Sequence, residues 1–192
     1  MRLERLGLDG AFLVKIERAS DERGFFARTY CAEEFRRAGI AGQVVQSSIS
    51  FNTRRSTVRG MHFQWPPSTE TKLVRCVRGA VFDVLLDLRP ESSTYLEHVS
   101  VELNEEERDS VFIPHGVAHG FQTMCDRAEV LYQMSDWYQP ALAAGVRWND
   151  PSFGIRWPVS EDIVISERDA AYPNFDRKAF ERELASRRVL RQ

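Results

Sequence analysis

The chain has 192 residues, of which 43% are hydrophobic and 28% charged, and its formal net charge is −2 at pH 7. This composition is typical of a single globular domain that buries a sizeable core without disulfide bonds. The balance of basic and acidic residues argues against a nucleic-acid partner, because non-specific binding needs a basic surface. The N-terminus lacks an apolar leader and no apolar stretch is long enough for a membrane span, so we expect a cytoplasmic protein with no membrane partner.

Three cysteines, Cys31, Cys76 and Cys125, lie far apart in the sequence, and no two of them form a CxxC pair. An odd number of cysteines without metal-ligand spacing disfavours both a disulfide framework and a zinc site. We therefore predict free thiols in a reducing compartment.

About ten short strands follow one another with little helix between them. The clearest is the segment 97–103, in which Val99, Val101 and Leu103 alternate with polar residues. Such a series predicts an all-β sandwich or barrel, and the jelly roll is the natural candidate. In chain order, the predicted strands cover residues 12–16, 25–30, 44–51, 57–64, 72–78, 80–88, 97–103, 111–113, 120–124 and 129–134.

Two helical segments accompany these strands. Residues 32–38 favour a short helix in which Phe35 is the apolar residue among charged ones. The tail over residues 176–192 has Phe180 and Leu184 at helical spacing among arginine and glutamate residues. We predict a surface helix or a frayed end there, with the basic residues on a solvated face.

Polar residues interrupt four of the apolar segments, and the first two are strand-like. Strict alternation would place Arg59 and His62 on opposite faces, but a bulge at Gly60 would turn both inward. A single strand histidine is most often a hydrogen-bonded core residue, yet histidine also suits a general base near neutral pH. Lys72 at the start of a strand usually reaches solvent, but inside a barrel it would stabilise negative charge on a carbonyl oxygen.

The third segment contains His115 and His119, four residues apart. The neighbouring proline and glycines favour a turn, and no glutamate follows His115, so the segment is not an HExxH zinc motif. The metal sites of common cupins resemble a His-x-His pair, and Gln64 occupies the position of the second histidine here. A metal site formed by these histidines with His62 is therefore disfavoured.

The fourth segment runs from Tyr132 to Tyr138. Tyr132 shares a strand face with Val130 and Met134, as a core tyrosine would. A phenol held at this position could instead protonate an enolate. Tyr138 follows the strand and could stack on a nucleobase.

Together these segments resemble the dTDP-4-dehydrorhamnose 3,5-epimerase family. One matching piece would be weakly specific, but the pieces follow the family order and cover about residues 20–172. The resemblance implies an all-β, cupin-type jelly-roll β-barrel with short peripheral helices, forming one domain over residues 1–192. Its core would cover about 12–172 and its helical tail about 174–192. The matching pieces are residues 21–26, 59–64, 72–75, 79–89, 113–121, 131–133, 148–151 and 166–170.

The resemblance also implies the reaction and its residues. The family inverts C3, C5 or both of a nucleoside-diphosphate 4-keto-6-deoxyhexose, usually as a homodimer whose N-terminal strands reach the partner, without metal or cofactor. His62 is then the catalytic base, Asp169 its orienting carboxylate, Tyr132 the general acid and Lys72 the group nearest the ketone oxygen. The substrate-binding positions are Arg23, Phe26, Arg28, Gln46, Ser48, Arg59, His119 and Tyr138.

The chain departs from the family pattern at positions that bind the substrate in the family. Arg28 replaces a common glutamate, and Ser47 and Ser48 replace a common Asp-Asn pair after Gln46. These positions usually touch nucleotide or sugar, so the substrate or the number of inverted centres is open. The alternatives are a single-centre epimerase of another sugar nucleotide, a metal-dependent cupin oxygenase or isomerase, and a non-catalytic sugar-binding jelly roll.

Overall fold

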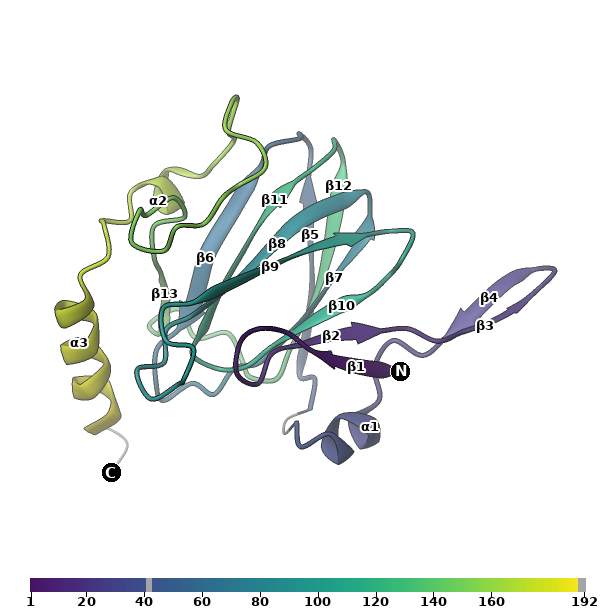
Figure 1. Cartoon of the computed structure of the whole chain (residues 1–192), viewed down its shortest axis with the longest axis horizontal. Coiled ribbons are helices and arrows are strands. Elements are labelled where there is room, and N and C mark those ends of the chain that lie inside the picture. The colour runs from purple at the N-terminus through teal and green to yellow at the C-terminus, as the bar shows by residue number, and fades with distance from the viewer. Residues whose placement is uncertain (41–42, 190–192) are drawn as a thin grey trace.

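The computed structural model describes residues 1–40 and 43–189 and contains two antiparallel sheets and a separate hairpin (Figure 1). One sheet has the strand order β1-β2-β10-β7-β12-β5, the other has the order β13-β6-β11-β8-β9, and β3 pairs with β4. The helices are α1 (Ala32–Arg37), α2 (Glu167–Ala170) and α3 (Arg177–Val189). The strands are β1 (Arg2–Arg5), β2 (Phe12–Lys15), β3 (Arg18–Asp21), β4 (Gly24–Ala27), β5 (Gln46–Asn52), β6 (Val58–Gln64), β7 (Lys72–Arg78), β8 (Ala80–Asp87), β9 (His98–Asn104), β10 (Ser110–Ile113), β11 (Val117–Thr123), β12 (Ala128–Met134) and β13 (Ala143–Gly145).

The main core lies between the two sheets. Alternate side chains of β7 and β12, including Val74 and Val130, meet alternate side chains of β8 and β11, including Leu85 and Phe121. All four are fully buried. Burial of each such side chain contributes about 1.5–3 kcal/mol. β11 is buried at every position, because the second sheet is covered on its outer face as well.

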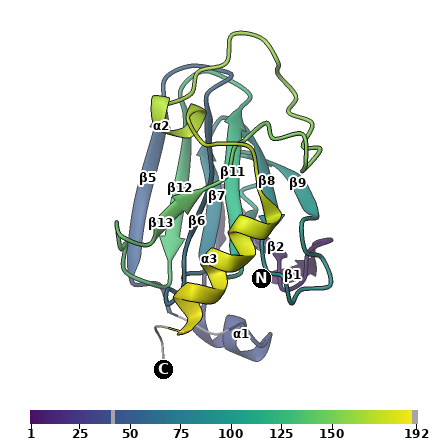
Figure 2. The same ribbon diagram turned by 90° about the vertical axis from the view of Figure 1, so that its left-hand side faces the viewer.

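The C-terminal segment covers the outer face of the second sheet (Figure 2). Phe180 of α3 packs on Phe63 and Trp65 of the β6 region at ring-centroid distances of 5.9 and 4.9 Å. Arg188 donates a hydrogen bond to Glu91 at 2.7 Å. Over Arg177–Val189 the tail is therefore a docked helix, the first of the two predicted alternatives, and residues 190–192 of the predicted tail lie outside the described residues.

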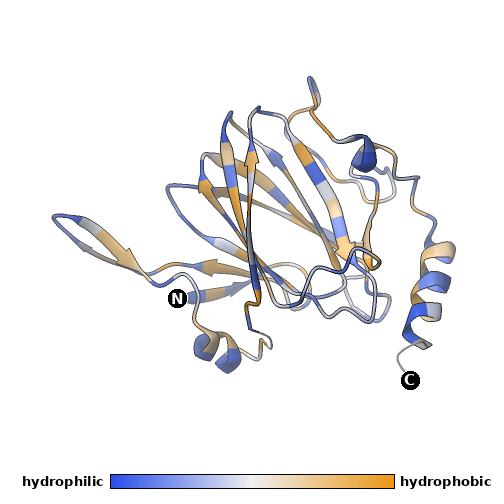
Figure 3. Ribbon diagram, turned by 180° about the vertical axis from the view of Figure 1, so that it is seen from behind, coloured by the Kyte–Doolittle hydropathy of each residue, from blue (hydrophilic) through white to orange (hydrophobic). Residues whose placement is uncertain are grey.

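The hairpin of β3 and β4 extends away from the sheets (Figure 1). Its apolar stretch is visible from behind in Figure 3, and Phe26 is 79% exposed. Nearby, Phe35 of α1 is buried against Phe112 of β10, as its position in the predicted helix suggests.

Several boundaries differ from the prediction. The predicted strand over 25–30 ends at Ala27. The strands β1, β3 and β13 were not expected, because β1 and β3 are rich in polar residues and β13 is three small residues long. Among the described residues, no helix is long and apolar enough to cross a membrane.

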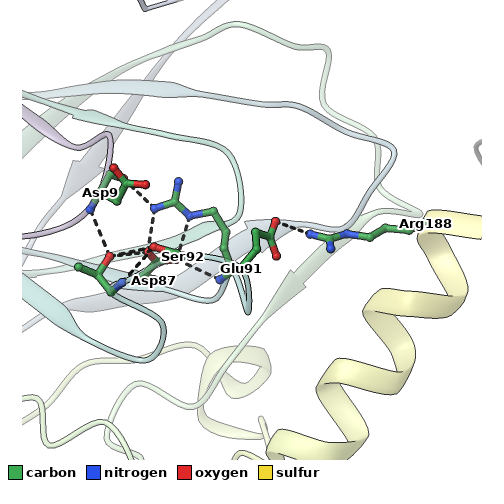
Figure 4. Close-up of polar contacts among 7 residues, drawn as sticks. Asp9, Asp87, Glu91, Ser92 and Arg188 are labelled. Carbon is green, nitrogen blue, oxygen red and sulfur yellow. Dashed lines mark hydrogen bonds and ion pairs between the residues drawn. The ribbon is translucent and has the colours of Figure 1, made fainter.

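A buried polar network links the end of β8 to the turn between β1 and β2 (Figure 4). The Asp87 side chain is fully buried and accepts hydrogen bonds from the side chains of Arg89, Ser92 and Thr94 at 2.6–2.9 Å. Arg89 also donates to the carbonyl oxygen of Asp9 at 2.7 Å. Burial alone would raise the pKa of Asp87, but the hydrogen bonds from Arg89 and the hydroxyls outweigh it and lower the pKa.

Replacing Asp87 with alanine should reduce the free energy of unfolding at pH 7 by about 3–5 kcal/mol, because it leaves the guanidinium of Arg89 without its partner. Since the folded-state pKa lies below 3.8, the carboxylate's contribution is present above that pH and is lost as the pH falls through the folded value. Urea unfolding of both proteins at pH 7 and near pH 3 checks this. The difference in free energy of unfolding between wild type and Asp87→Ala should be smaller near pH 3 than at pH 7. The control is Glu181→Ala, which removes an exposed ion pair with Arg177 and should change the free energy of unfolding much less at pH 7.

Candidate active site

A pocket of about 230 Å³ opens between β6, β7, β12 and the segment that precedes β13. Five of the predicted site residues line this pocket: Ser48, His62, Lys72, Tyr132 and Tyr138. A larger cavity of about 550 Å³ near α1 contains none of the predicted site residues. The complete lining of the smaller pocket is Ser48, His62, Phe63, Gln64, Glu70, Lys72, Tyr132, Met134, Tyr138, Ala143, Ala144 and Arg168.

His62 and Asp169 form a hydrogen-bonded pair. The distance from His62 Nε2 to Asp169 Oδ1 is 2.7 Å, and the backbone N–H of Gly60 donates to the other carboxylate oxygen at 3.2 Å. Ser166 caps α2 by accepting a hydrogen bond from the backbone N–H of Asp169 at 3.1 Å, which fixes the helix turn that carries the carboxylate. With Nε2–H donated to the carboxylate, Nδ1 of His62 carries the lone pair that can accept a proton.

The Asp169 carboxylate stays ionised in this arrangement. Its residue is only 5% exposed, and burial would raise its pKa. The hydrogen bond and charge of His62, together with the Gly60 N–H, outweigh burial and lower the pKa. An ionised carboxylate favours the positively charged imidazole that forms when His62 takes up a proton.

A bulge in β6 lies at Gly60, as the sequence predicted, and His62 lines the pocket, but Arg59 is exposed and does not turn inward with it. His62 pairs with His119 on β11, whereas Arg59 pairs with Phe121, so two residues of β6 face one of β11. Gly60 has a φ of +118°. A Cβ atom at this position would lie 2.5 Å from a backbone Cα of β11. The close approach of the two strands therefore requires glycine.

Replacing Gly60 with alanine should lower the free energy of unfolding by at least about 2 kcal/mol, since the methyl group forces β6 away from β11. The same shift moves the N–H that binds Asp169, so activity should fall as well. Urea unfolding together with a turnover assay checks both effects. Gly154, which also has a positive φ but no atom within 4 Å of its Cβ position, is the control for backbone strain alone. An equal loss at both glycines would contradict the steric explanation.

Tyr132 of β12 contributes a protonated phenol. Burial raises its pKa well above the usual range, and the nearby charge of Asp83 raises it further, with only partial opposition from Arg59. The Tyr132 ring packs edge-on against His119 at 5.7 Å between centroids. His119 Nε2 is held by Asp83 Oδ2 at 2.8 Å, and both side chains are buried. His119 thus supports the phenol from inside the barrel.

Two further predicted residues, Gln46 and Arg59, lie beside the pocket without lining it. Gln46 accepts a hydrogen bond from the backbone N–H of Tyr138 at 2.6 Å, which ties the loop after β12 to the start of β5. Arg59 donates to Asn52 at 2.7 Å and lies outside the residues that line the pocket. Its charge nevertheless acts on Tyr132.

Three predicted binding residues do not join the pocket within one chain. Arg23 binds Asp21 in the hairpin, and Arg28 binds Glu34 of α1 at 2.9 Å. Phe26 is exposed on β4. The hairpin extends away from the barrel (Figure 1), so one copy of the chain does not bring these residues to its own pocket, and their role as binding residues stays a prediction.

Two charged residues in the pocket wall were missed by the sequence analysis. Glu70 contacts Lys72 with a distance of 3.3 Å between Oε2 and Nζ. Arg168 lies near the hydroxyls of Tyr172 and Tyr138, which raise its pKa. Glu70 could have been found from its spacing of two residues before Lys72, and Arg168 from its position next to Asp169.

The pocket therefore combines an imidazole hydrogen-bonded to a carboxylate, a phenol that holds its proton and an ammonium group. These are the groups needed to remove a proton next to a carbonyl, to stabilise the resulting enolate and to return a proton. Among residues 1–40 and 43–189, no group of three or more His, Cys, Asp or Glu side chains is placed to hold a metal ion.

Comparison with known proteins agrees with this chemistry. The family model for dTDP-4-dehydrorhamnose 3,5-epimerase matches residues 5–177. The dTDP-4-dehydrorhamnose 3,5-epimerase of Methanothermobacter thermautotrophicus is 41% identical over 170 residues, which are 88% of this chain and 91% of that protein. A dTDP-4-dehydrorhamnose 3-epimerase of Streptomyces niveus is 38% identical over 170 residues, 88% of this chain and 81% of the relative.

A solved structure gives the same result for the fold. The dTDP-6-deoxy-D-glucose-3,5-epimerase of Legionella pneumophila superposes with a TM-score of 0.87 at 32% identity, covering 95% of this chain and 96% of that one. Such similarity confirms the predicted cupin-type jelly roll. By sequence, fold and the residues of its pocket, the chain belongs to the dTDP-4-dehydrorhamnose 3,5-epimerase family of isomerases.

Proposed function

We propose that this protein inverts C3, C5 or both of a nucleoside-diphosphate 4-keto-6-deoxyhexose, with His62 as base and Tyr132 as acid. The observation that carries the proposal is the 2.7 Å hydrogen bond between His62 and Asp169 in a pocket that also contains Tyr132 and Lys72. The Legionella relative was solved in complex with dTDP-4-keto-L-rhamnose, which supports a dTDP-linked sugar as the substrate here.

In the proposed mechanism, Nδ1 of His62 removes the proton from a carbon next to the C4 ketone, and the electron pair of that C–H bond moves to the ketone oxygen. The ammonium of Lys72 donates a hydrogen bond to the enolate oxygen, an effect worth about 3 kcal/mol in comparable oxyanion sites. Tyr132 then donates its proton to the carbon from the opposite face of the ring, and the electron pair returns from the oxygen. The imidazolium loses its proton to solvent and the phenolate gains one.

The part of the pocket wall formed by Arg168 and Tyr138 suits an anionic ligand. Arg168 and Tyr138 stand together in the wall of the pocket, and Arg168 forms no ion pair with a carboxylate among the described residues. A guanidinium donates two parallel hydrogen bonds to a phosphate group. We assign this part of the wall to the diphosphate, with Tyr138 next to it for the base or the sugar.

We also propose a homodimer in which the β3–β4 hairpin of each copy reaches the other. This would give Arg23, Phe26 and Arg28 a role in the partner's site that they cannot have in their own. The hairpin's exposed Phe26, and the exposed Ile49 on the edge strand β5, support such a contact because they would bury apolar surface. Sedimentation equilibrium should give twice the chain mass of 22.1 kDa, and a monomer mass would contradict the arrangement.

The three cysteines are free, which supports a reducing, cytoplasmic location for the protein. We further take residues 1–192 as one domain, because β1 and β2 pair with β10 of the core and α3 packs against β6.

The test is proton NMR of the purified protein with dTDP-4-keto-6-deoxyglucose in deuterated water. Deuterium should enter at C3, at C5 or at both, and the number of labelled carbons tells a double from a single epimerase. The Streptomyces niveus relative, a 3-epimerase by name, makes labelling at C3 alone the second candidate outcome. No deuterium at either carbon would overturn the proposed function.

A further inference from the structure

A nearly enclosed carboxylate that the proposed mechanism does not use lies in the pocket. The side chain of Glu70 is 9% exposed and lines the pocket with His62 and Lys72. Its Oε2 is 3.3 Å from Nζ of Lys72. Glu70 precedes Lys72 by two residues, so both side chains point to the same side of the chain as it enters β7.

Local hydrogen bonds hold the backbone segment that carries Glu70. The backbone N–H of Glu70 donates to Oγ of Ser68 at 3.2 Å, and the Ser68 hydroxyl donates to Asp136 at 2.8 Å. The backbone N–H of Thr71 donates to Oγ of Ser135 at 2.8 Å. The segment before β7 is thus tied to the segment after β12, and Glu70 stands on a fixed backbone.

The carboxylate keeps unused acceptor capacity. Across residues 1–40 and 43–189, Lys72 is the only side chain that forms an ion pair with Glu70, and no hydrogen bond to its carboxylate is formed. A carboxylate accepts several hydrogen bonds, and a ligand that displaces water from Glu70 without replacing those bonds incurs a desolvation penalty. A ligand hydroxyl that donates to Glu70 would relieve this penalty through a charge-assisted hydrogen bond.

We propose that Glu70 binds the C3 hydroxyl of the sugar while Lys72 binds the C4 ketone oxygen. The assignment rests on the proposed function, which places the ketone at Lys72. Oxygens on adjacent ring carbons are separated by about one hydrogen-bond length, which matches the 3.3 Å between the two side chains. Of the carbons next to C4, only C3 carries a hydroxyl, because C5 carries the methyl group and the ring oxygen.

The pair thus recognises an α-hydroxyketone, with a donor for the ketone oxygen and an acceptor for its neighbouring hydroxyl. A sugar without the C3 hydroxyl leaves the Glu70 carboxylate unpaired in the complex. Sites built to hydrogen-bond a substrate hydroxyl reject analogues that lack it, because their polar group then stays unsatisfied. Glu70 is in this way a specificity-determining residue.

The experiment compares wild type and Glu70→Ala with two substrates, dTDP-4-keto-6-deoxyglucose and its 3-deoxy analogue, by total deuterium uptake at C3 and C5, since both sugars carry exchangeable protons next to the ketone. With the 3-hydroxy sugar, Glu70→Ala should lower kcat/KM by roughly 10- to 100-fold, as expected for a hydrogen bond to a charged group. With the 3-deoxy sugar, the two enzymes should agree within about twofold, because the deleted partners no longer interact. Glu70→Gln keeps the side-chain shape and should lose less than the alanine variant.

Glu129→Ala is the matched control, since Glu129 of β12 pairs with Arg78 outside the pocket. It should leave both substrates unaffected, and circular dichroism should show that the Glu70 variants are folded. If Glu70→Ala lost the same factor in kcat/KM with both substrates, Glu70 would act only through Lys72. This result would overturn the assignment of Glu70 to the C3 hydroxyl but not the proposed function. An unchanged kcat/KM in both Glu70 variants would do the same. A wild-type enzyme inactive on the 3-hydroxy sugar would overturn the proposed function together with the assignment.

Discussion

Replacing His62 with asparagine should lower the rate of deuterium uptake into a 4-keto sugar nucleotide by about 10²- to 10⁴-fold, the usual contribution of a general base. Asparagine is close in size and can still donate a hydrogen bond to Asp169, but it has no nitrogen that accepts a proton. The stability of the protein should change little, because the His62 side chain is 40% exposed. Proton NMR at high enzyme concentration measures the residual exchange.

The control is His98→Asn on β9, which replaces a histidine that does not line the pocket. Its exchange rate should equal that of the wild type. If His62→Asn exchanged at the wild-type rate, the base would have to be another residue, and the 2.7 Å contact with Asp169 would have only a structural role.

Replacing Tyr132 with phenylalanine should separate exchange from inversion. The ring and its packing on His119 remain, and only the hydroxyl that delivers the second proton is lost. His62 can still remove a proton and return a deuteron to the same face, so label should enter the substrate without inversion. Formation of the epimer should fall by about 10²- to 10⁴-fold. NMR coupling constants distinguish the epimers, and the same spectra report the label.

Tyr30→Phe serves as the control, since Tyr30 packs against Phe35 and lies outside the pocket. It should invert the substrate as fast as the wild type. The raised pKa of Tyr132 adds a pH prediction, because the phenol then keeps its proton through neutral and mildly alkaline solution. Inversion should therefore not decline there through loss of the Tyr132 proton. Inversion at the wild-type rate by Tyr132→Phe would contradict the assignment of the acid.

Much of the barrel could be predicted because its strands follow local rules. Alternation identified the inward face of β9, where Leu103 is buried and Val99 and Val101 pack against the main core. The glycine between Arg59 and His62 indicated the bulge. Lys72 and Tyr132 were ambiguous from pattern alone, since either could have been a solvent-facing or core residue. The resemblance to the family, rather than local physics, assigned their roles.

The parts that escaped prediction depend on contacts between distant segments. The neighbourhood of Arg168 and Tyr138 arises only when α2 folds over the pocket, and no periodicity indicates that contact. For the residues of the β3–β4 hairpin, the resemblance predicted a position that one copy of the chain does not provide. Family resemblance placed Arg23 and Phe26 in the site, but one copy of the chain holds them away from its own pocket.

The pair formed by His62 and Asp169 joins positions 107 residues apart. During translation, the base emerges early, while its carboxylate follows only after every strand of both sheets has been made. A nascent chain, or a fragment cleaved after β13, can therefore hold all its strands and still lack the completed dyad. The pair is completed only when the segment that contains Asp169 folds back onto β6, so a chain that stops before this segment should lack the proposed base–carboxylate pair even with all its strands in place.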